Sequence, residues 1–452
     1  MKLKKFDYKL PREETKKKKR IMLVLSSLVI CIVITLASSY AYYQSIELQN
    51  PYDTKVGEFD SGDIIFAITI DGESSSSFPA KDSGYIISGV TCDKGAIAKW
   101  GVNAWNFEIR NLTQSKTTCN VSYVTGTLDE SGTLAYKVLQ QYGGSSAINE
   151  APAGTFNNIS TATTNVMYKM EDDYGTSYYY RGAKDLLNNN LIFAGFQWKI
   201  VRINGDGSIR IIYNGLCPDN FCVVDGEEND IGIINGERYP FHTHINDVKY
   251  GGYMFGGASG IASTSREQAV TNETSSNAKT VLEAWYTTYI ENEGYSQYIS
   301  DTLFCNDRRL EEGTGQGFGN ASVYHVARNR LYLNKIPTLM CGDKNDKFTV
   351  NDTIIGNGAL DKPIGLLAAD EVVLAGTSNT FYLNNGSGNF WTLTPVLYGY
   401  GTGSNINTMH FGQIGYSLGT PNNLFGLRSV INLNSGIRAI GNGSTTDPFI
   451  VK

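Results

Sequence analysis

The alternation of apolar and polar residues along the chain predicts mostly β structure, interrupted by a few helices. Residues 193–215 show this pattern most clearly, because apolar and polar side chains alternate from Phe196 to Ile200, as in a half-buried strand. Residues 204–207, Asn-Gly-Asp-Gly, tolerate positive φ, and Ile209 to Tyr213 then returns as a second strand. The segment therefore predicts a hairpin. Its acidic residue, Asp206, has no partner acids at metal spacing and is assigned to the turn rather than to calcium.

Residues 63–126 contain four short β-type stretches separated by turn residues. The stretches are residues 63–72, 84–92, 106–112 and 117–126. Strands at this spacing predict a small β-sandwich-like domain. Trp100 and Trp105 are expected in its core, because buried aromatic rings dominate the packing of such domains.

A connector and a larger domain complete the chain. Residues 127–175 hold one short helical stretch, residues 134–141, and then a polar stretch typical of a connector. In the larger domain, residues 176–452, an amphipathic helix is predicted over residues 275–290 and a second helix over residues 368–375. Further β-type stretches lie at residues 389–395, 409–418, 427–433 and 447–452. The predicted fold class is α+β, mostly β.

The N-terminus carries a long apolar run. Residues 21–43 hold no charged side chain, and a helix of this length spans a hydrocarbon core of about 30 Å. Residues 1–20 contain ten Lys or Arg against three Asp or Glu, a net +7, which by the positive-inside bias keeps this tail in the cytoplasm. The sequence predicts a single-pass protein of the cell membrane: a transmembrane helix in the lipid bilayer, a linker over residues 44–62, and extracellular domains.

A cleaved signal peptide is the alternative for the same segment. Ser39-Tyr40-Ala41 places small residues at the spacing of a signal-peptidase site. The apolar run is longer than the usual roughly 7–15 residues, which favours a retained anchor. Both alternatives export everything that follows.

The charge of the exported part bears on its binding partners, and its cysteines bear on disulfide formation. The whole chain carries −6, so residues 21–452 carry −13, which argues against nucleic acid as a partner. Six cysteines lie beyond the apolar run: Cys92, Cys119, Cys217, Cys222, Cys305 and Cys341. An even number in an exported chain predicts disulfides, and the most local of the possible connectivities joins them in sequence order. Zinc is the competing interpretation, but the chain has no Cys-x-x-Cys.

The histidines offer one weak metal candidate. His242 and His244 are alternate residues, which on a strand point to one face, and neutral imidazoles there would hold zinc or copper. No third ligand is apparent, so an exposed polar pair is the favoured interpretation. His325 is expected to be an ordinary packed or surface residue. No cofactor is predicted.

Signatures of common enzymes are missing from the sequence. There is no Gly-x-Ser-x-Gly, no His-Glu-x-x-His and no P-loop. Asp370-Glu371 and Glu311-Glu312 are adjacent carboxylates, but neighbours in sequence tend to point apart, whereas glycoside cleavage needs two facing carboxyl groups. Asp370 and Glu371 also begin a predicted helix, where their charge complements its dipole. No catalytic residue is assigned.

Aromatic residues gather with Gly and Asn near the C-terminus. Tyr398, Tyr400 and His410 are candidates for ligand contact, because such loops offer flat aromatic faces and adaptable hydrogen bonds. The two tyrosines are expected to be exposed. Trp391 is expected in the core.

A set of motifs recurs in a fixed order over roughly residues 63–452. They are YYYRGAKDLLNNNLIFAGFQWKIVRINGDGSIRIIYNG, GGYMFG, SNAKTVLEAWY, DTLFCNDRR, IPTLMCGDKNDKFTV, KPIGLLAADEVVLAG, FWTLTP, LRSVINL and GNGSTTDPFIVK. Together they resemble an uncharacterised family of surface proteins from Gram-positive, often gut-dwelling, bacteria. The resemblance implies a C-terminal domain of unknown function similar to the C-type lectin-like fold of sulfatase-modifying factors. It also supports a Cys305–Cys341 pair. Because no cysteine follows Cys341, the reactive cysteine pair of formylglycine-forming relatives is not implied.

These features favour an extracellular binding or adhesion-type protein without catalytic activity, whose ligand is a glycan or a surface protein. One alternative is a surface enzyme of unassigned type that acts on cell-wall or glycan substrates with carboxylates of the larger domain. A structural component of the envelope is another.

Overall fold

The computed structural model describes residues 64–451 with internal gaps. Left out are residues 81–82, 84, 95, 102–105, 111–115, 126–131, 158–165, 226–231, 313–321, 377–379, 385, 387, 400–401 and 410–417. In the part of the chain that is described, no helix is long and apolar enough to cross a bilayer. The predicted transmembrane helix, residues 21–43, lies outside that part.

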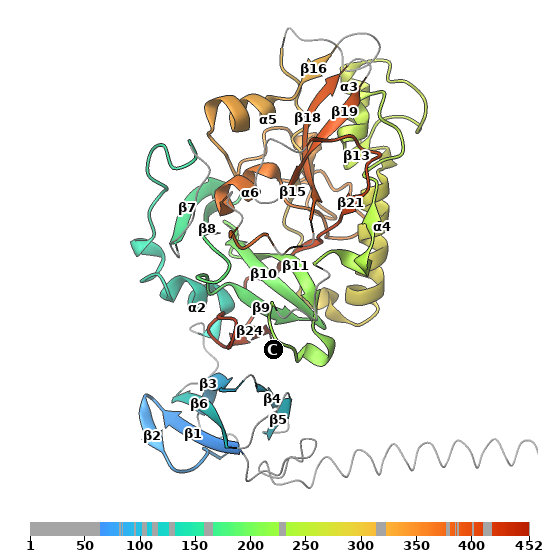
Figure 1. Cartoon of the computed structure of the whole chain (residues 1–452). Coiled ribbons are helices and arrows are strands. Elements are labelled where there is room, and N and C mark those ends of the chain that lie inside the picture. Colours follow the sequence, from blue (N-terminus) through green and yellow to red (C-terminus); the bar gives the residue numbers. More distant parts are fainter. Residues whose placement is uncertain are drawn as a thin grey trace, which may run out of the picture.

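The N-terminal unit is built around a four-stranded sheet with the order β2-β1-β6-β3 (Figure 1). Its strands are β1 Ile64–Ile70, β2 Glu73–Ser75, β3 Tyr85–Cys92 and β6 Thr117–Thr125. A separate hairpin joins β4 Ile97–Gly101 to β5 Asn106–Arg110. Cys92 lies directly opposite Cys119 in the β3–β6 register, so their disulfide links neighbouring strands. Trp105 and the side chain of Trp100 lie outside the described residues.

A mixed eight-stranded sheet forms the centre of the larger domain, with the order β22-β11-β10-β9-β24-β23; in addition β8 pairs with β10, and β7 pairs with β8. Its strands are β7 Val166–Asp172, β8 Gly175–Arg181, β9 Asn190–Phe193, β10 Phe196–Ile203, β11 Ile209–Leu216, β22 Val430–Leu433, β23 Ala439–Ile440 and β24 Phe449–Val451. The β10–β11 hairpin has the predicted position, and its turn lies at residues 204–208.

The predicted half-burial of β10 is wrong. All eight of its residues are buried, including Gln197 and Lys199. Gln197 and Lys199 donate hydrogen bonds to Val223 and Asp225, which lie in the segment that follows β11. The alternation in β10 therefore distinguishes an apolar face from a polar face, and both faces are buried in the protein.

A six-stranded second sheet pairs strands that are far apart in sequence. Its members are β12 Arg238–Tyr239, β16 Val323–Tyr324, β18 Phe390–Gly399, β19 Gly403–Met409, β20 Leu418–Gly419 and β21 Phe425–Gly426. Two small ribbons join β13 Met254–Phe255 to β14 Thr274–Ser275 and β15 Phe304–Cys305 to β17 Lys347–Phe348.

Helices cover the sheets of the larger domain (Figure 1). They are α2 Leu134–Gln140, α3 Arg266–Ala269, α4 Asn277–Tyr286, α5 Val326–Arg328 and α6 Ala369–Ala375. The predicted amphipathic helix is α4, whose N-cap Ser276 accepts a hydrogen bond from the backbone of Lys279. The predicted second helix is α6, which ends at Gly376.

The stretch predicted as a connector contributes to the main core. Leu134 and Val138 of α2 are buried in the same cluster as Trp198 of β10. The N-terminal unit in turn shares its core with the larger domain, because Ile440 of β23 is buried in the N-terminal cluster and Ile450 of β24 packs against it. Figure 1 shows this unit lying next to β24.

The three predicted disulfides are confirmed. Cys92–Cys119, Cys217–Cys222 and Cys305–Cys341 are bonded, with Cα–Cα distances of 4.0, 5.2 and 5.7 Å. The pairing is the most local one. The competing zinc interpretation is thereby wrong for these six cysteines, since a disulfide sulfur is no thiolate ligand.

Candidate functional site

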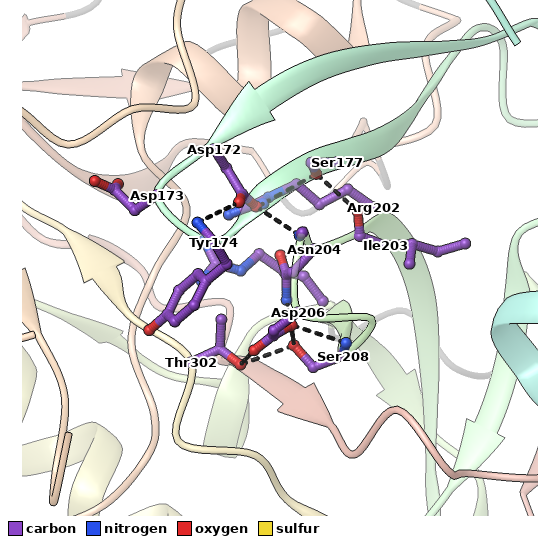
Figure 2. A network of polar contacts seen from close by, with 12 residues as sticks. Asp172, Asp173, Tyr174, Ser177, Arg202, Ile203, Asn204, Asp206, Ser208 and Thr302 are labelled. Atoms are coloured by element: carbon purple, nitrogen blue, oxygen red, sulfur yellow. Dashed lines mark hydrogen bonds and ion pairs between the residues drawn. The ribbon is translucent and has the colours of Figure 1, made fainter. Parts of the chain in front are cut away.

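A buried network of charges joins β7, β8 and β10 (Figure 2). The Nη1 atom of Arg202 lies 2.5 Å from Oδ2 of Asp172 and donates to the hydroxyl of Ser177 over 3.1 Å. The Asp172 carboxylate also accepts the backbone N–H groups of Tyr174 and Gly205, at 2.8 and 3.0 Å. Opposite charges meet inside the protein, which makes this network part of the framework.

The turn after β10 is closed by Asp206 (Figure 2). Its Oδ1 accepts the backbone N–H of Ser208 at 2.8 Å, and its Oδ2 accepts the hydroxyl of Thr302 at 3.0 Å. The carboxylate therefore holds the turn, as predicted.

Two of the four carboxylates considered for an enzyme, Asp370 and Glu371, form ion pairs with arginines. Oε1 of Glu371 accepts from Nε of Arg202 at 3.0 Å and from Nη1 of Arg210 at 2.8 Å. Burial acts to raise the pKa of Glu371, but the two guanidinium groups outweigh it and lower the pKa. Asp370 forms a two-pronged contact with Arg330, at 2.7 and 2.8 Å. These contacts favour the structural interpretation of both acids.

The two candidate metal ligands do not form a strand. Nδ1 of His242 accepts the backbone N–H of His244 at 2.9 Å, and its ring stacks on Tyr250 with the ring centres 4.5 Å apart. His242 is buried, contrary to the predicted exposed pair, whereas His244 is exposed as predicted; burial lowers the pKa of His242 to about 4. Across the residues that the structure describes, no group of three metal-ligating side chains occurs. His325 is buried, as an ordinary packed residue would be.

The aromatic candidates are placed only in part. Tyr398 is 4% exposed, and its hydroxyl donates to the carbonyl of Asn246 over 3.3 Å, so its predicted exposure is wrong. Because β18 continues to Gly399, the tyrosine belongs to a strand and not to a loop. Tyr400 and His410 lie outside the described residues. Trp391 is buried in the core, as expected.

A cleft between the N-terminal unit and the larger domain is the best candidate for a site. Its volume is about 340 Å³, within the range of small-molecule sites. The N-terminal unit contributes Val90, Cys92, Asp93, Lys94, Ala96 and Ala98. The larger domain contributes Ile192, Asn220, Phe221, Cys222, Val223, Ile440, Thr445, Thr446, Asp447, Pro448 and Ile450. Most of these side chains are apolar, and the polar ones lie on three short segments, at residues 93–94, 220 and 445–447.

Two disulfides hold the walls of this cleft. Cys92 is bonded to Cys119 within the sheet of the N-terminal unit, and Cys222 is bonded to Cys217 at the end of β11. Each bond fixes a lining segment to a buried strand. The walls are therefore built before a ligand arrives, which lowers the entropic cost of binding.

Asp447 is an acidic residue of the cleft whose pKa is strongly shifted. Asp447 is 6% exposed, and burial raises the pKa of its carboxyl group to about 7. Backbone hydrogen bonds from Val90 and Asn442 and the charge of Lys137 oppose this shift without cancelling it. The group therefore changes its charge near neutral pH, beside an apolar surface.

A second hollow of about 450 Å³ is wide and charged. Its deepest groups, Arg308 and Asp346, lie 2.5 Å apart and neutralise each other. It offers less enclosure than the first cleft. For this reason we take the first cleft as the candidate site.

Sequence reasoning missed the cleft and Asp447. The lining comes from segments that are hundreds of residues apart, and Asp447 stands in an ordinary Thr-Thr-Asp-Pro turn. Comparison of the chain with family models, with curated proteins and with solved structures gave no match.

Proposed function

We propose that this chain is a membrane-anchored extracellular binding protein without catalytic activity, whose ligand is a glycan or a protein. The cleft at Asp447 carries the proposal. Its lining combines many apolar side chains with the hydroxyl groups of Thr445 and Thr446 and the carboxyl groups of Asp93 and Asp447, and ligand sites are generally built in this way.

Two further features support the proposal. The three disulfides fit an oxidising compartment outside the cytoplasm. The arginine contacts of Asp370 and Glu371 argue against the alternative of a surface enzyme that uses these carboxylates.

The proposal includes a membrane anchor and a fold assignment for the larger domain. Residues 21–43 supply the apolar length for a bilayer span, and the basic residues before them set its direction. For the larger domain we propose a C-type lectin-like fold. The mixed sheets and the helix α4 packed in their core are compatible with this assignment.

Binding is tested with the full-length protein in detergent, screened against immobilised glycans and envelope fractions. The informative variant is Val223→Glu, because Val223 lines the cleft and is 43% exposed, so that a charge there leaves the core intact. Ile354→Glu is the matched control, since Ile354 is 90% exposed and does not line the cleft. We expect binding that the first variant abolishes and the second preserves. Equal binding by both variants would remove the cleft from the proposal.

Localisation needs its own measurement. Intact cells are treated with a protease that cannot cross the membrane, and the protein is followed with an antibody to its C-terminus. Loss of the C-terminal epitope from the membrane fraction is expected. Recovery of the intact protein from cytosol with six free thiols would refute the export of the domains.

A further inference from the structure

Lys199, Asn190 and Asp225 form a compact buried group in the larger domain. Nζ of Lys199 lies 2.5 Å from Oδ1 of Asn190 and 2.6 Å from Oδ2 of Asp225. The amine thus contacts both a carboxamide oxygen and a carboxylate oxygen. Since an amide C=O bond is about 1.23 Å long, Nζ is at most about 3.7 Å from Cγ of Asn190. This distance approaches that of reacting atoms held for attack, about 3–3.5 Å.

The sheet fixes the amine and the carboxamide. Lys199 of β10 is directly opposite Asn190 of β9 in the antiparallel register, and the two strands are joined by a tight turn. Nδ2 of Asn190 donates to the carbonyl of Gly443 over 2.8 Å, which leaves Oδ1 facing the lysine. The carboxamide is therefore oriented by the backbone of another segment.

Hydrogen bonds also hold Asp225 in place. The backbone N–H of Asp225 donates to Oε1 of Gln197 over 3.0 Å, and Oδ1 of Asp225 accepts from Nδ2 of Asn214 over 2.8 Å. The disulfide Cys217–Cys222 closes the loop that leads to this residue. Hydrogen bonds to β10 and β11, together with the Cys217–Cys222 disulfide, thus hold Asp225 beside Lys199.

Burial favours the reactive form of the amine. The side chain of Lys199 is 1% exposed and Asn190 is buried, whereas Asp225 keeps 23% of its side chain exposed. Burial lowers the pKa of Lys199, although the charge of Asp225 opposes the shift. A neutral amine is the nucleophilic form, and a buried lysine reaches it more readily than an exposed one.

We propose that Lys199 and Asn190 form a covalent amide crosslink within this chain, with Asp225 as the proton carrier. The proposal is independent of the proposed binding function. The crosslink would join β9 to β10 at the end opposite their turn.

The reaction balances without any oxidant or cofactor. Asp225 takes a proton from the Lys199 ammonium, and the freed lone pair of Nζ attacks Cγ of Asn190 to form an N–C bond. The carboxylic acid returns a proton to Nδ2, the Cγ–Nδ2 bond breaks, and ammonia leaves while Asp225 accepts the second proton of Nζ. Ammonia then takes that proton away as ammonium. The net change converts one ammonium and one primary amide into one secondary amide and ammonium.

Lys279 shows what distinguishes this group from an ordinary buried ion pair. It is also buried, but its partners are the carboxylates of Glu283 and Asp361, at 2.8 and 2.9 Å. A carboxylate is a poor electrophile, whereas a carboxamide beside a proton carrier loses ammonia. Lys279 therefore serves as an internal control.

A tryptic digest of the purified full-length protein tests the crosslink. The protein is reduced and denatured first. Without a crosslink, trypsin cuts after Lys199 and yields a peptide of residues 185–199. With it, Lys199 is acylated and resists cleavage, so that the product is a looped peptide of residues 185–202 that lacks the mass of one ammonia. Cleavage at Lys199 with the full sequence mass would overturn the proposal, and Lys279 should be cleaved in every case.

A succinimide at Asn190 would lose the same ammonia, but it would leave Lys199 cleavable. That result also counts against the crosslink. Fragment ions supply the second criterion, because a looped peptide gives no backbone fragments between residues 190 and 199.

The role of Asp225 is tested with Asp225→Asn, and Asp219→Asn, in the exposed part of the same loop, is the matched control. Proton transfer by a side chain contributes roughly a hundredfold or more to a rate. We expect the crosslinked fraction of Asp225→Asn to fall to a small remainder, while Asp219→Asn stays fully crosslinked. A fully crosslinked Asp225→Asn would exclude the proton carrier. The wild-type digest decides the crosslink itself even if Asp225→Asn does not fold.

Discussion

Nε of Arg202 donates to Oε1 of Glu371 over 3.0 Å, joining β10 to the first turn of α6 across 169 residues of chain. The same carboxylate oxygen receives Arg210 from β11. One acid therefore compensates two buried cations of the central hairpin, while its other oxygen caps α6 through the backbone N–H of Ala368. Removal of this acid would take from Arg210 the carboxylate that it contacts, while Arg202 would keep its ion pair with Asp172.

We accordingly predict that Glu371→Gln destabilises the protein by about 3–5 kcal/mol, because breaking a buried ion pair leaves an uncompensated charge. Denaturant unfolding followed by tryptophan fluorescence measures the change. Glu291→Gln is the control, since Glu291 forms its salt bridge with Lys362 at the surface and should matter little. Equal effects of the two variants would contradict the framework role of Glu371.

The disulfides should differ in their contribution to stability according to the loop that each closes. Replacing Cys305 and Cys341 with Ser opens a loop with a sequence separation of 36, and about 3–4 kcal/mol should be lost. The same change at Cys217 and Cys222, with a separation of 5, should cost about 2 kcal/mol. Chemical denaturation of both double variants is the test. The reverse order would show that strain or local packing outweighs chain entropy.

Asp447 should make stability depend on pH near neutrality. Its pKa in the folded protein, about 7, is higher than the ordinary value of 3.8 for an aspartic acid, so the folded state favours the protonated acid. The associated stabilisation is complete below the unfolded pKa and is lost as the pH rises through about 7. Asp447→Asn keeps a neutral side chain at every pH, and we expect it to be more stable than the wild type at pH 8, by at most roughly 4 kcal/mol.

The comparison is made by thermal or chemical unfolding at pH 4 and pH 8. The advantage of Asp447→Asn should shrink toward pH 4, where the wild-type acid is protonated in the folded protein. A constant difference at both pH values would mean that Asp447 does not titrate in this range.

Gly205 should not tolerate a side chain. A Cβ at this position would lie 2.4 Å from the backbone nitrogen of Gly175 and 2.6 Å from Oδ1 of Asp172. We expect Gly205→Ala to cost about 1–3 kcal/mol or more, as overpacking does. Gly436→Ala is the control, because a Cβ there meets no atom within 4 Å. The test compares the unfolding midpoint of each variant with that of the wild type. An unchanged midpoint for Gly205→Ala would contradict the close approach of Gly175 and Asp172 to Gly205.

Local patterns account for the elements that were predicted correctly. The β10–β11 hairpin follows from alternation interrupted by Asn-Gly-Asp-Gly, and α6 follows from its initial acids and Gly376. The disulfides were predictable because cysteines close in sequence meet at low entropic cost.

The errors arise where a residue's surroundings come from distant segments. Lys199 looks solvent-facing in the sequence, but Asp225 and Asn190 cover it. Tyr398 is followed by glycines in the sequence, yet strand pairing continues through it, and its hydroxyl donates a hydrogen bond to the carbonyl of Asn246.

The sequence by itself determined the mostly β composition, the hairpin at residues 196–216, the helix starts and the cysteine partners, because each depends on residues near one another in the chain. Only the tertiary structure decided that β10 is buried on both faces, that Asp447 lies in a cleft and that Lys199 meets Asn190 and Asp225. These properties depend on contacts between distant segments and on the exclusion of water. No local pattern of residues encodes either of them.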